Sequence, residues 1–210
     1  VIVKEFYVER PVPYFLEYAR HYTDLPFAVV LEERAGAETP GRFLRAADLG
    51  LATNNALWKT VVYDATEGGF AVPNGSIGFR WNEEGRWNLK METDGRPIAP
   101  LLSFADQNDG WRTVAFPVFA EAGAGLKKGQ VPYKTVTTPT GERRVTTVFD
   151  LMAAHLGVRL PNAPPAIADD PTDYADPKPF TPAWQEAITG VPAADAIRVA
   201  REFAGNAEQT

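Results

Sequence analysis

"QVPYKTVTTPTGERRVTTVF", Gln130 to Phe149, contains two β-prone runs separated by one turn signal. Valine, threonine and tyrosine, which fit the pleated surface of a sheet, make up much of both runs. Pro139-Thr140-Gly141 lies between the runs and is typical of a tight turn. Two such runs joined by a few residues predict an antiparallel hairpin.

The same sequence pattern, β-prone runs separated by turn residues, extends from about Gly36 to Gly141. Short β-prone runs alternate there with Gly, Asn, Asp and Pro, and this pattern predicts a meander of antiparallel hairpins. The runs before the opening stretch are "WKTVVYD", "GFAVP", "SIGFRW", "RWNLKME" and "WRTVAFPVF". On the other side of that stretch, "FDLMAAHLG" predicts a short helix that Gly157 ends.

The N-terminal part predicts a helix followed by a buried strand. In "RPVPYFLEYARHYTD", residues 10–24, the prolines suit a first helical turn. Phe15, Ala19 and Tyr22 fall on one face of that helix. "FAVVLEE", residues 27–33, is a continuous apolar run bounded by charge, as in a buried strand, and the helix before it makes this strand a candidate for parallel pairing.

The C-terminal part predicts a connector and two helices. Residues 161–180 hold six prolines and four aspartates with one lysine, so they favour an extended, solvated connector. Thr181-Pro182 predicts the start of one helix, and Pro192 opens a second helix with Gly205 as its stop. One face of the second helix carries Ile197, Ala200 and Ala204, flanked by Val199 and Phe203.

Composition limits the function classes. The chain has 210 residues, of which 45% are hydrophobic and 23% charged, which suits one large or two small globular domains. A net charge of -6, without a basic stripe, argues against sequence-independent nucleic-acid binding. The longest apolar run is far shorter than the ~18 residues of a membrane span. Because there is no cysteine, disulfides, thiolate metal sites and a cysteine nucleophile are excluded within these residues.

The start of the sequence suggests a piece of a longer chain. It begins at Val1 with "VIVKEF", which predicts either a short strand or the end of a helix, and no signal-peptide pattern accompanies it. An apolar face left uncovered on the last helix favours the same interpretation.

The isolated polar residues give no catalytic motif. His21 and His155 lie on separate predicted helices without a metal-binding spacing, so structural or surface roles are favoured. Ser76 in "NGSIG" precedes a predicted strand rather than the helix that a nucleophile elbow requires. Adjacent acids such as Glu32 and Glu33 point to opposite faces of a strand, which disfavours a glycosidase pair.

The stretch "NGSIGFRWNEEGRWNLK", residues 74–90, concentrates arginine and tryptophan: Arg80, Trp81, Arg86 and Trp87. In a hairpin, the two tryptophans could stack across the strand pair or cover the arginines. Arg and Trp are also enriched in the most important contacts of protein interfaces. These four residues are therefore candidates either for packing within the hairpin or for an interface.

Four stretches of the sequence carry a resemblance to one family. They are "FLRAADLG", "WKTVVYD", "VPNGSIGFRWNEEGRWNLK" and "TPAWQEAITGVPAADAIRVAREFAGNAEQT". In this order they strongly resemble the middle of the alpha (catalytic) subunits of respiratory nitrate reductases, in the molybdopterin oxidoreductase (DMSO reductase) family. The last stretch is similar to the wider family, and the hairpin is similar to the nitrate reductase branch.

The resemblance implies a parent enzyme that reduces nitrate to nitrite in anaerobic respiration with a molybdenum bis(molybdopterin guanine dinucleotide) cofactor. It implies a 4Fe-4S cluster in the same subunit, an iron-sulfur beta subunit and a membrane cytochrome subunit as partners, and a peripheral location on the cytoplasmic face of the bacterial cell membrane. No position here matches the family's aspartate ligand to molybdenum or its His and Cys cluster site. We therefore expect no catalytic, cofactor-binding or metal-binding residue in this internal fragment, which should bind no cofactor and be inactive alone.

We expect an α/β fold (α+β as a fragment), with Rossmann-like α/β elements at both ends and an inserted antiparallel β-hairpin-rich subdomain. The expected parts are 1–35, a helix and strand of the parent α/β layer, and 36–160, the β-rich subdomain with a short helix near its end. They continue with 161–180, the Pro/Asp-rich connector, and 181–210, the C-terminal helices of the α/β layer. The remaining domains of the same subunit are expected partners. The alternative is a non-catalytic interaction module that binds a partner through the β-hairpin.

Overall fold

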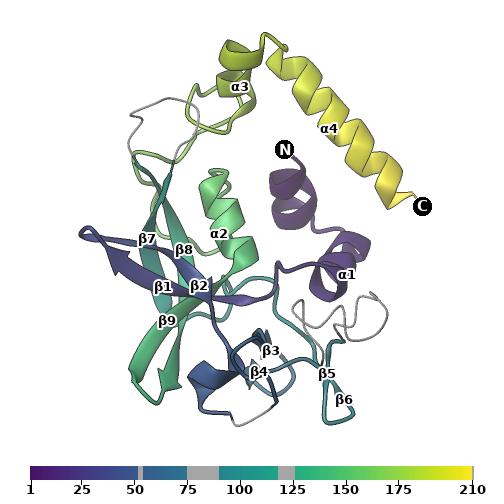
Figure 1. The fold of residues 1–210 in the computed structure, drawn as a ribbon. Coiled ribbons are helices and arrows are strands. Elements are labelled where there is room, and N and C mark those ends of the chain that lie inside the picture. Colours follow the sequence, from purple (N-terminus) through teal and green to yellow (C-terminus); the bar gives the residue numbers. More distant parts are fainter. Residues whose placement is uncertain (52–53, 75–89, 118–125, 210) are drawn as a thin grey trace.

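A closed five-stranded β-barrel forms the centre of the protein (Figure 1). The computed structural model describes residues 1–51, 54–74, 90–117 and 126–209. The barrel strands are β1 (Ala28–Arg34), β2 (Ala37–Phe43), β7 (Gly110–Pro117), β8 (Leu126–Thr138) and β9 (Gly141–Thr147), hydrogen-bonded in that order. β9 pairs with β1 and closes the barrel, so neither of these strands is an unpaired sheet edge.

The hairpin predicted from Gln130 to Phe149 is confirmed as β8 and β9. The strands pair antiparallel from Lys134 opposite Val145 to Thr138 opposite Gly141. Gly141 has a φ of 113°, and the Thr138 hydroxyl donates to its carbonyl oxygen at 2.6 Å. A positive φ is accessible to glycine without a Cβ clash, so the turn signal specifies the register of this hairpin.

The apolar run at residues 27–33 forms the predicted buried strand, β1, but the parallel pairing for which it was a candidate does not occur. β1 pairs antiparallel with both of its neighbours, β2 and β9. The cause lies in the turn after β1, where Ala35 and Gly36 have φ values of 50° and 77°. Two consecutive residues with positive φ make a tight hairpin turn, which returns the chain alongside β1. Within the described part of the chain, the parallel contact of this barrel is between β2 and β7, with Glu38 opposite Val114.

Small hairpins and a 3-10 helix lie beside the barrel. β3 (Val62–Asp64) pairs with β4 (Gly69–Ala71), which confirms strands within "WKTVVYD" and "GFAVP". β5 (Glu92–Thr93) pairs with β6 (Arg96–Pro97), and η2 (Ala46–Leu49) follows β2. The ring of Tyr63 packs edge-on against those of Phe70 and Phe104, so the β3–β4 hairpin shares a hydrophobic cluster with the barrel.

Helix α2 (Val148–His155) starts directly after β9 and covers one side of the barrel (Figure 1). Thr147 caps it by accepting a hydrogen bond from the Asp150 backbone N–H at 3.0 Å. Leu151 and Ala154 belong to a core cluster with residues of the barrel strands. Phe149 and Ala153 belong to a second cluster, which includes Ala19 of α1. Gly157 follows the helix with a φ of 75°, as its predicted stop position requires.

The two ends of the described chain lie side by side (Figure 1). They consist of η1 (Val3–Glu9), a π-helix, with α1 (Pro13–Tyr22), α3 (Pro182–Thr189) and α4 (Ala193–Glu208). Phe6, Phe15 and Ala204 share one buried cluster. "VIVKEF" is therefore helical, and Thr181 caps α3 as predicted, by accepting from the Trp184 N–H at 3.1 Å.

Two details of these helices differ from expectation. Gly205 does not end α4, which continues to Glu208, because Gly205 keeps a helical rather than a left-handed conformation. Tyr22 is not on the buried face of α1: its side chain is 64% exposed and its ring lies 5.3 Å from that of Tyr18. Phe15 and Ala19 are buried as predicted.

The connector at 161–180 contains no helix or strand but is more firmly held than its composition indicates. Asp170 is buried and accepts hydrogen bonds from the Arg159 guanidinium at 2.7 Å and from the Ile167 N–H at 3.0 Å. Lys178 donates to the Asp170 carbonyl oxygen at 2.6 Å. An aspartate that pairs with arginine can thus fold a proline-rich segment onto the surface.

The protein mixes helices with antiparallel and parallel strands, as an α/β or α+β fold does. The Rossmann-like layer and the four-part division stay predictions. Among the described residues, no helix combines the length and apolar character needed to cross a bilayer.

Candidate functional site

The four residues singled out in the sequence, Arg80, Trp81, Arg86 and Trp87, lie outside the described residues. The chain on either side of them is described, and it pairs. Lys90 donates its backbone N–H to the Asn74 carbonyl oxygen at 2.9 Å, in an antiparallel bridge. The role of the four residues in packing or in an interface stays a prediction.

The two histidines have different surroundings and do not form one site. His21 on α1 pairs with Glu17 at 2.9 Å on the surface. The His155 ring lies between two aromatic rings: it stacks on Phe116 at 5.2 Å and meets the edge of Phe180 at 4.6 Å. Burial, reinforced by the nearby positive charge of Lys127, lowers the pKa of His155. His155 is therefore a neutral packing residue near pH 7.

A buried lysine stabilises the end of α2. Lys127 on β8 donates its ammonium to the Ala154 carbonyl oxygen at 3.0 Å, in the last turn of the helix. Burial lowers its pKa, and the carboxylates of Asp170 and Asp169 partly oppose this effect. A cation at a helix C-terminus is favourable because the last carbonyls carry partial negative charge. The sequence "AGLKKGQ" gives no signal of this burial.

A fully buried carboxyl group lies at the start of α2. Oδ2 of Asp150 accepts a hydrogen bond from the Phe104 backbone N–H at 3.0 Å, which joins the loop before β7 to the helix. Oδ1 has no hydrogen-bond partner among the described residues. Burial raises the pKa of Asp150 to about 6, against the opposing effect of its hydrogen bonds, including those with Ser103 and Phe104. The geometry gives Asp150 a tethering role for the loop.

A cleft of about 540 Å³ lies between β1, β2, η2 and the β8–β9 turn. Arg42 is bidentate to Asp48, with both N–O distances 2.6 Å, and this pairing lowers the pKa of the Asp48 carboxyl. Glu32 pairs with Arg34 at 2.7 Å and lies over Gly41, where a Cβ atom would come within 2.6 Å of Glu32 Cδ. The charges named here are paired with each other, so the cleft suits polar contact rather than proton transfer.

The described residues offer no set of donor atoms suited to a redox-metal centre. The sequence has no cysteine, and the described residues contain no group of three or more His, Cys, Asp or Glu side chains that could hold a metal ion. Iron-sulfur clusters are held by cysteine thiolates, with histidine replacing some of them in certain types. These 210 residues therefore cannot supply a cysteine-bound cluster.

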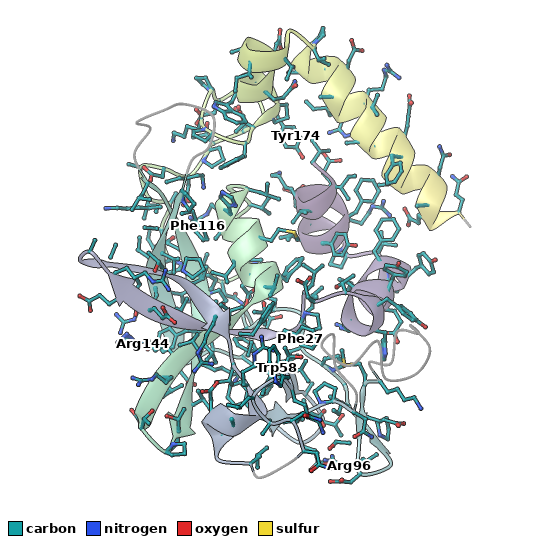
Figure 2. The ribbon with its side chains drawn as sticks, in the orientation of Figure 1. Phe27, Trp58, Arg96, Phe116, Arg144 and Tyr174 are labelled. Atoms are coloured by element: carbon teal, nitrogen blue, oxygen red, sulfur yellow. The ribbon has the colours of Figure 1, made fainter. Side chains whose placement is uncertain are left out.

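A polar cluster joins the two ends of the chain. Arg201 on α4 binds both carboxylate oxygens of Glu5 on η1, with distances of 2.8 and 2.9 Å. The Tyr174 hydroxyl donates to Glu5 Oε1 at 2.9 Å, and Figure 2 shows Tyr174 in the connector beside η1. The pairing with Arg201 lowers the pKa of Glu5, and burial together with Glu5 raises the pKa of Tyr174. Arg10 and Glu208 form a second bidentate pair, at 2.8 and 2.9 Å.

No protein-family model matches the chain. Curated relatives do match it, over its whole length. It is 42% identical over 213 residues to the nitrate reductase alpha chain of Bacillus subtilis (strain 168) and 41% identical over 225 residues to the respiratory nitrate reductase 1 alpha chain of Escherichia coli (strain K12). The chain belongs to the nitrate reductase alpha-chain family. This confirms the resemblance found in the sequence.

The alpha-chain relatives are much longer than the 210 residues. The chain spans 17% of the Bacillus subtilis protein and 18% of the Escherichia coli protein. A third relative, the nitrate reductase alpha subunit of Mycobacterium tuberculosis (strain ATCC 25618 / H37Rv), is 42% identical over 221 residues, with 17% of its length covered. The barrel and helices described above thus correspond to about one sixth of a nitrate reductase alpha chain.

Proposed function

We propose that these residues form a structural segment of a molybdenum-dependent nitrate reductase, which reduces nitrate to nitrite at centres held by other parts of the enzyme. The observation that carries this proposal is the match over the whole chain, at 41–42% identity, to nitrate reductase alpha chains of three bacteria. A sequence conserved at this level over a barrel and its surrounding helices indicates a common fold in those proteins.

The chemistry of the segment supports a structural rather than a catalytic role. It lacks cysteine and, in the described residues, a metal-binding group. Its buried ionisable residues bind the protein itself: Asp150 holds the backbone N–H of Phe104, and Lys127 holds the carbonyl oxygen of Ala154. When present in the whole enzyme, the molybdenum cofactor would supply the redox chemistry, and this segment would contribute rigidity and contact surface.

The finer assignments follow from the family resemblance. We propose that the enzyme carries molybdenum bis(molybdopterin guanine dinucleotide) and a 4Fe-4S cluster, both ligated outside these residues. We also propose that its partners are an iron-sulfur beta subunit and a membrane cytochrome subunit, and that it works in anaerobic respiration on the cytoplasmic face of the membrane. Residues 181–210 would then lie in the α/β layer of the alpha chain, beside the inserted β-rich part.

A segment exchange tests the proposal. In the Escherichia coli alpha chain, the matching segment is replaced by these 210 residues, and the purified complex is assayed for molybdenum content and for nitrate reduction with a reduced viologen. We expect a complex that retains molybdenum and turnover. As a matched control, the same exchange with Gly129→Ala, which forces β8 against the backbone of α2, should lower the yield of the complex.

Two results would contradict the proposal. A chimera that assembles and loads molybdenum but shows no nitrate turnover would show that this chain does not serve the reaction in place of its relative. Nitrate turnover by the 210-residue chain alone would show that the reacting group lies within it. That result would contradict the structural role proposed here for the segment.

The alternative function is an interaction module without enzymatic activity. It is favoured by large apolar side chains that are more than half exposed on two helices, including Tyr14, Tyr18 and Phe203. The match to nitrate reductase alpha chains argues against this alternative, and a segment exchange that retains nitrate turnover would exclude it.

A further inference from the structure

The turn between α3 and α4 and the outer side of α4 expose large apolar side chains. Val199 and Phe203, one helical turn apart on α4, are 54% and 69% exposed. Ile188 near the end of α3 and Val191 in the turn are 58% and 46% exposed. We call these four residues the α4 apolar strip. Single exposed apolar residues are common, but several along one helix and its preceding turn indicate a contact surface.

The α4 apolar strip is held in a fixed orientation. The opposite side of α4 packs on the N-terminal helices through Ala204, which is 1% exposed and shares a cluster with Phe6 and Phe15. The bidentate pairs of Glu5 with Arg201 and of Arg10 with Glu208 bind α4 along its second half. In Figure 1, α4 lies along the outer edge of the molecule, with η1 and α1 on one side. Val199 and Phe203 are therefore presented outward by a docked helix.

The charges beside the strip are compensated within α4. Arg198 contacts Glu202 at 3.1 Å and Asp195 at 3.4 Å, and both contacts lie within three or four residues along the helix. These three side chains form a polar strip that is rotated around the helix from Phe203. A surface that binds the α4 apolar strip can therefore be apolar and does not need to supply a charge for it.

The lengths of the relatives indicate what binds this strip. The 210 residues span 17–18% of the nitrate reductase alpha chains they match, so those proteins contain roughly five times as much further chain. We propose that an apolar surface of the same alpha chain, from outside these 210 residues, packs on Val199 and Phe203 in the assembled enzyme. This inference rests on the proposed function, and it names the covering surface as intramolecular rather than as another subunit or a membrane.

Site-specific photo-crosslinking in the complete enzyme tests the inference. A photoreactive amino acid replaces Phe203 in the full-length alpha chain that carries this segment, and the crosslinked peptides are identified by mass spectrometry. We expect the main product to join Phe203 to a peptide of the same alpha chain outside the segment. A probe at Arg198 is the control, because it lies on the polar strip of the same helix and has similar exposure.

Each other product contradicts the inference. A main crosslink to a different subunit would assign the strip to a subunit interface, and a crosslink to lipid would assign it to a membrane surface. No crosslink at Phe203, or a yield equal to that of the Arg198 probe, would show that the strip faces solvent in the enzyme.

A pair of substitutions gives an independent readout. Phe203→Asp in the full-length chain places a charge against an apolar surface, so we expect a roughly tenfold lower yield of assembled complex, whereas Phe203→Leu should leave the yield near that of the parent. Equal yields for the two variants would overturn the inference. The unsubstituted enzyme is assayed for nitrate reduction in the same series, so that a failure of the proposed function is seen separately from a failure of this contact.

Discussion

Arg201 and Glu5 form a bidentate ion pair although 196 residues separate them in the sequence. The pair joins α4 to η1, and the Tyr174 hydroxyl donates to the same carboxylate from the connector. Three segments that are distant in the sequence thus meet at one carboxylate. Because this contact is bidentate and charge-assisted, its geometry is more favourable than that of a typical surface ion pair.

Removal of this pair should loosen α4 without unfolding the barrel. In Arg201→Met, we expect faster amide hydrogen exchange along α4 and unchanged exchange in β8 and β9, since the strands have their own hydrogen bonds. Arg198→Met is the matched control, because the partners of Arg198 lie within α4 itself. Equal effects of the two substitutions on α4 exchange would show that the contact with Glu5 does not hold the helix in place.

The buried carboxyl of Asp150 should produce a distinctive pH dependence of stability. Its pKa is raised to about 6, above the ordinary value of 3.8, so between these values the folded state binds a proton that the unfolded state does not. The stabilising contribution is therefore complete below pH 3.8 and is lost as the pH rises through about 6. Between pH 7 and pH 5 the unfolding free energy of the parent should rise by about 1 kcal/mol relative to Asp150→Asn.

Urea denaturation at the two pH values measures this difference. The comparison with Asp150→Asn removes the contributions of the other titrating groups, which both proteins share. The asparagine can still accept the hydrogen bond from the Phe104 backbone N–H, so the variant should fold. A difference between the two proteins that does not change from pH 7 to pH 5 would show that Asp150 has the same pKa in the folded and unfolded states.

Local signals in the sequence were sufficient for much of the fold. The turn at Pro139-Thr140-Gly141 predicted the β8–β9 hairpin because its two strands are adjacent in the sequence. Thr181 predicted the start of α3 because a capping hydroxyl acts within three residues. Such features depend on the backbone nearby, so composition and spacing reveal them.

The remaining features depend on residues that are far apart in the sequence. The barrel closes where Ala28 pairs with Thr147, and no local pattern indicates that contact. The predicted parallel pairing of β1 was wrong because the positive φ angles at Ala35 and Gly36 return the chain at once. The burial of Lys127 and Asp150 is not predictable from the local sequence, because each side chain contacts a segment that is distant along the chain. Lys127 contacts the end of α2, and Asp150 contacts the loop at Phe104.

Acid should loosen the attachment of the connector to the barrel through His155. Burial and Lys127 lower the pKa of this histidine below 6.5, so its contribution is present above pH 6.5 and is lost as the pH falls through the lowered value. The charged ring would then lie between Phe116 and Phe180, with a buried Nε2 that has no hydrogen-bond partner among the described residues. The protection factors of the amides near Phe180, which are exchange rates corrected for the intrinsic effect of pH, should therefore be lower at acid pH than at pH 7.

His155→Phe is the matched variant for this prediction. It keeps an aromatic ring between Phe116 and Phe180 and removes the titrating group, so the loss of protection at acid pH should be much smaller than in the parent. If the variant responds to acid as strongly as the parent does, a group other than His155 controls the attachment of the connector.

Gly129 allows β8 and α2 to pack closely. A Cβ atom at this position would lie 2.9 Å from the Ala154 carbonyl oxygen and 3.0 Å from its Cβ. The same carbonyl oxygen accepts the hydrogen bond from Lys127, so the backbone cannot move away without weakening that contact. Gly129→Ala should therefore lower the unfolding free energy by about 1–3 kcal/mol, the usual cost of overpacking a core.

Gly69→Ala is the control, because a Cβ there meets no atom within 4 Å, and its denaturation midpoint should stay close to that of the parent. Equal midpoints for the two variants would mean that α2 can shift on β8 at little cost, and that the Lys127 contact does not fix its position.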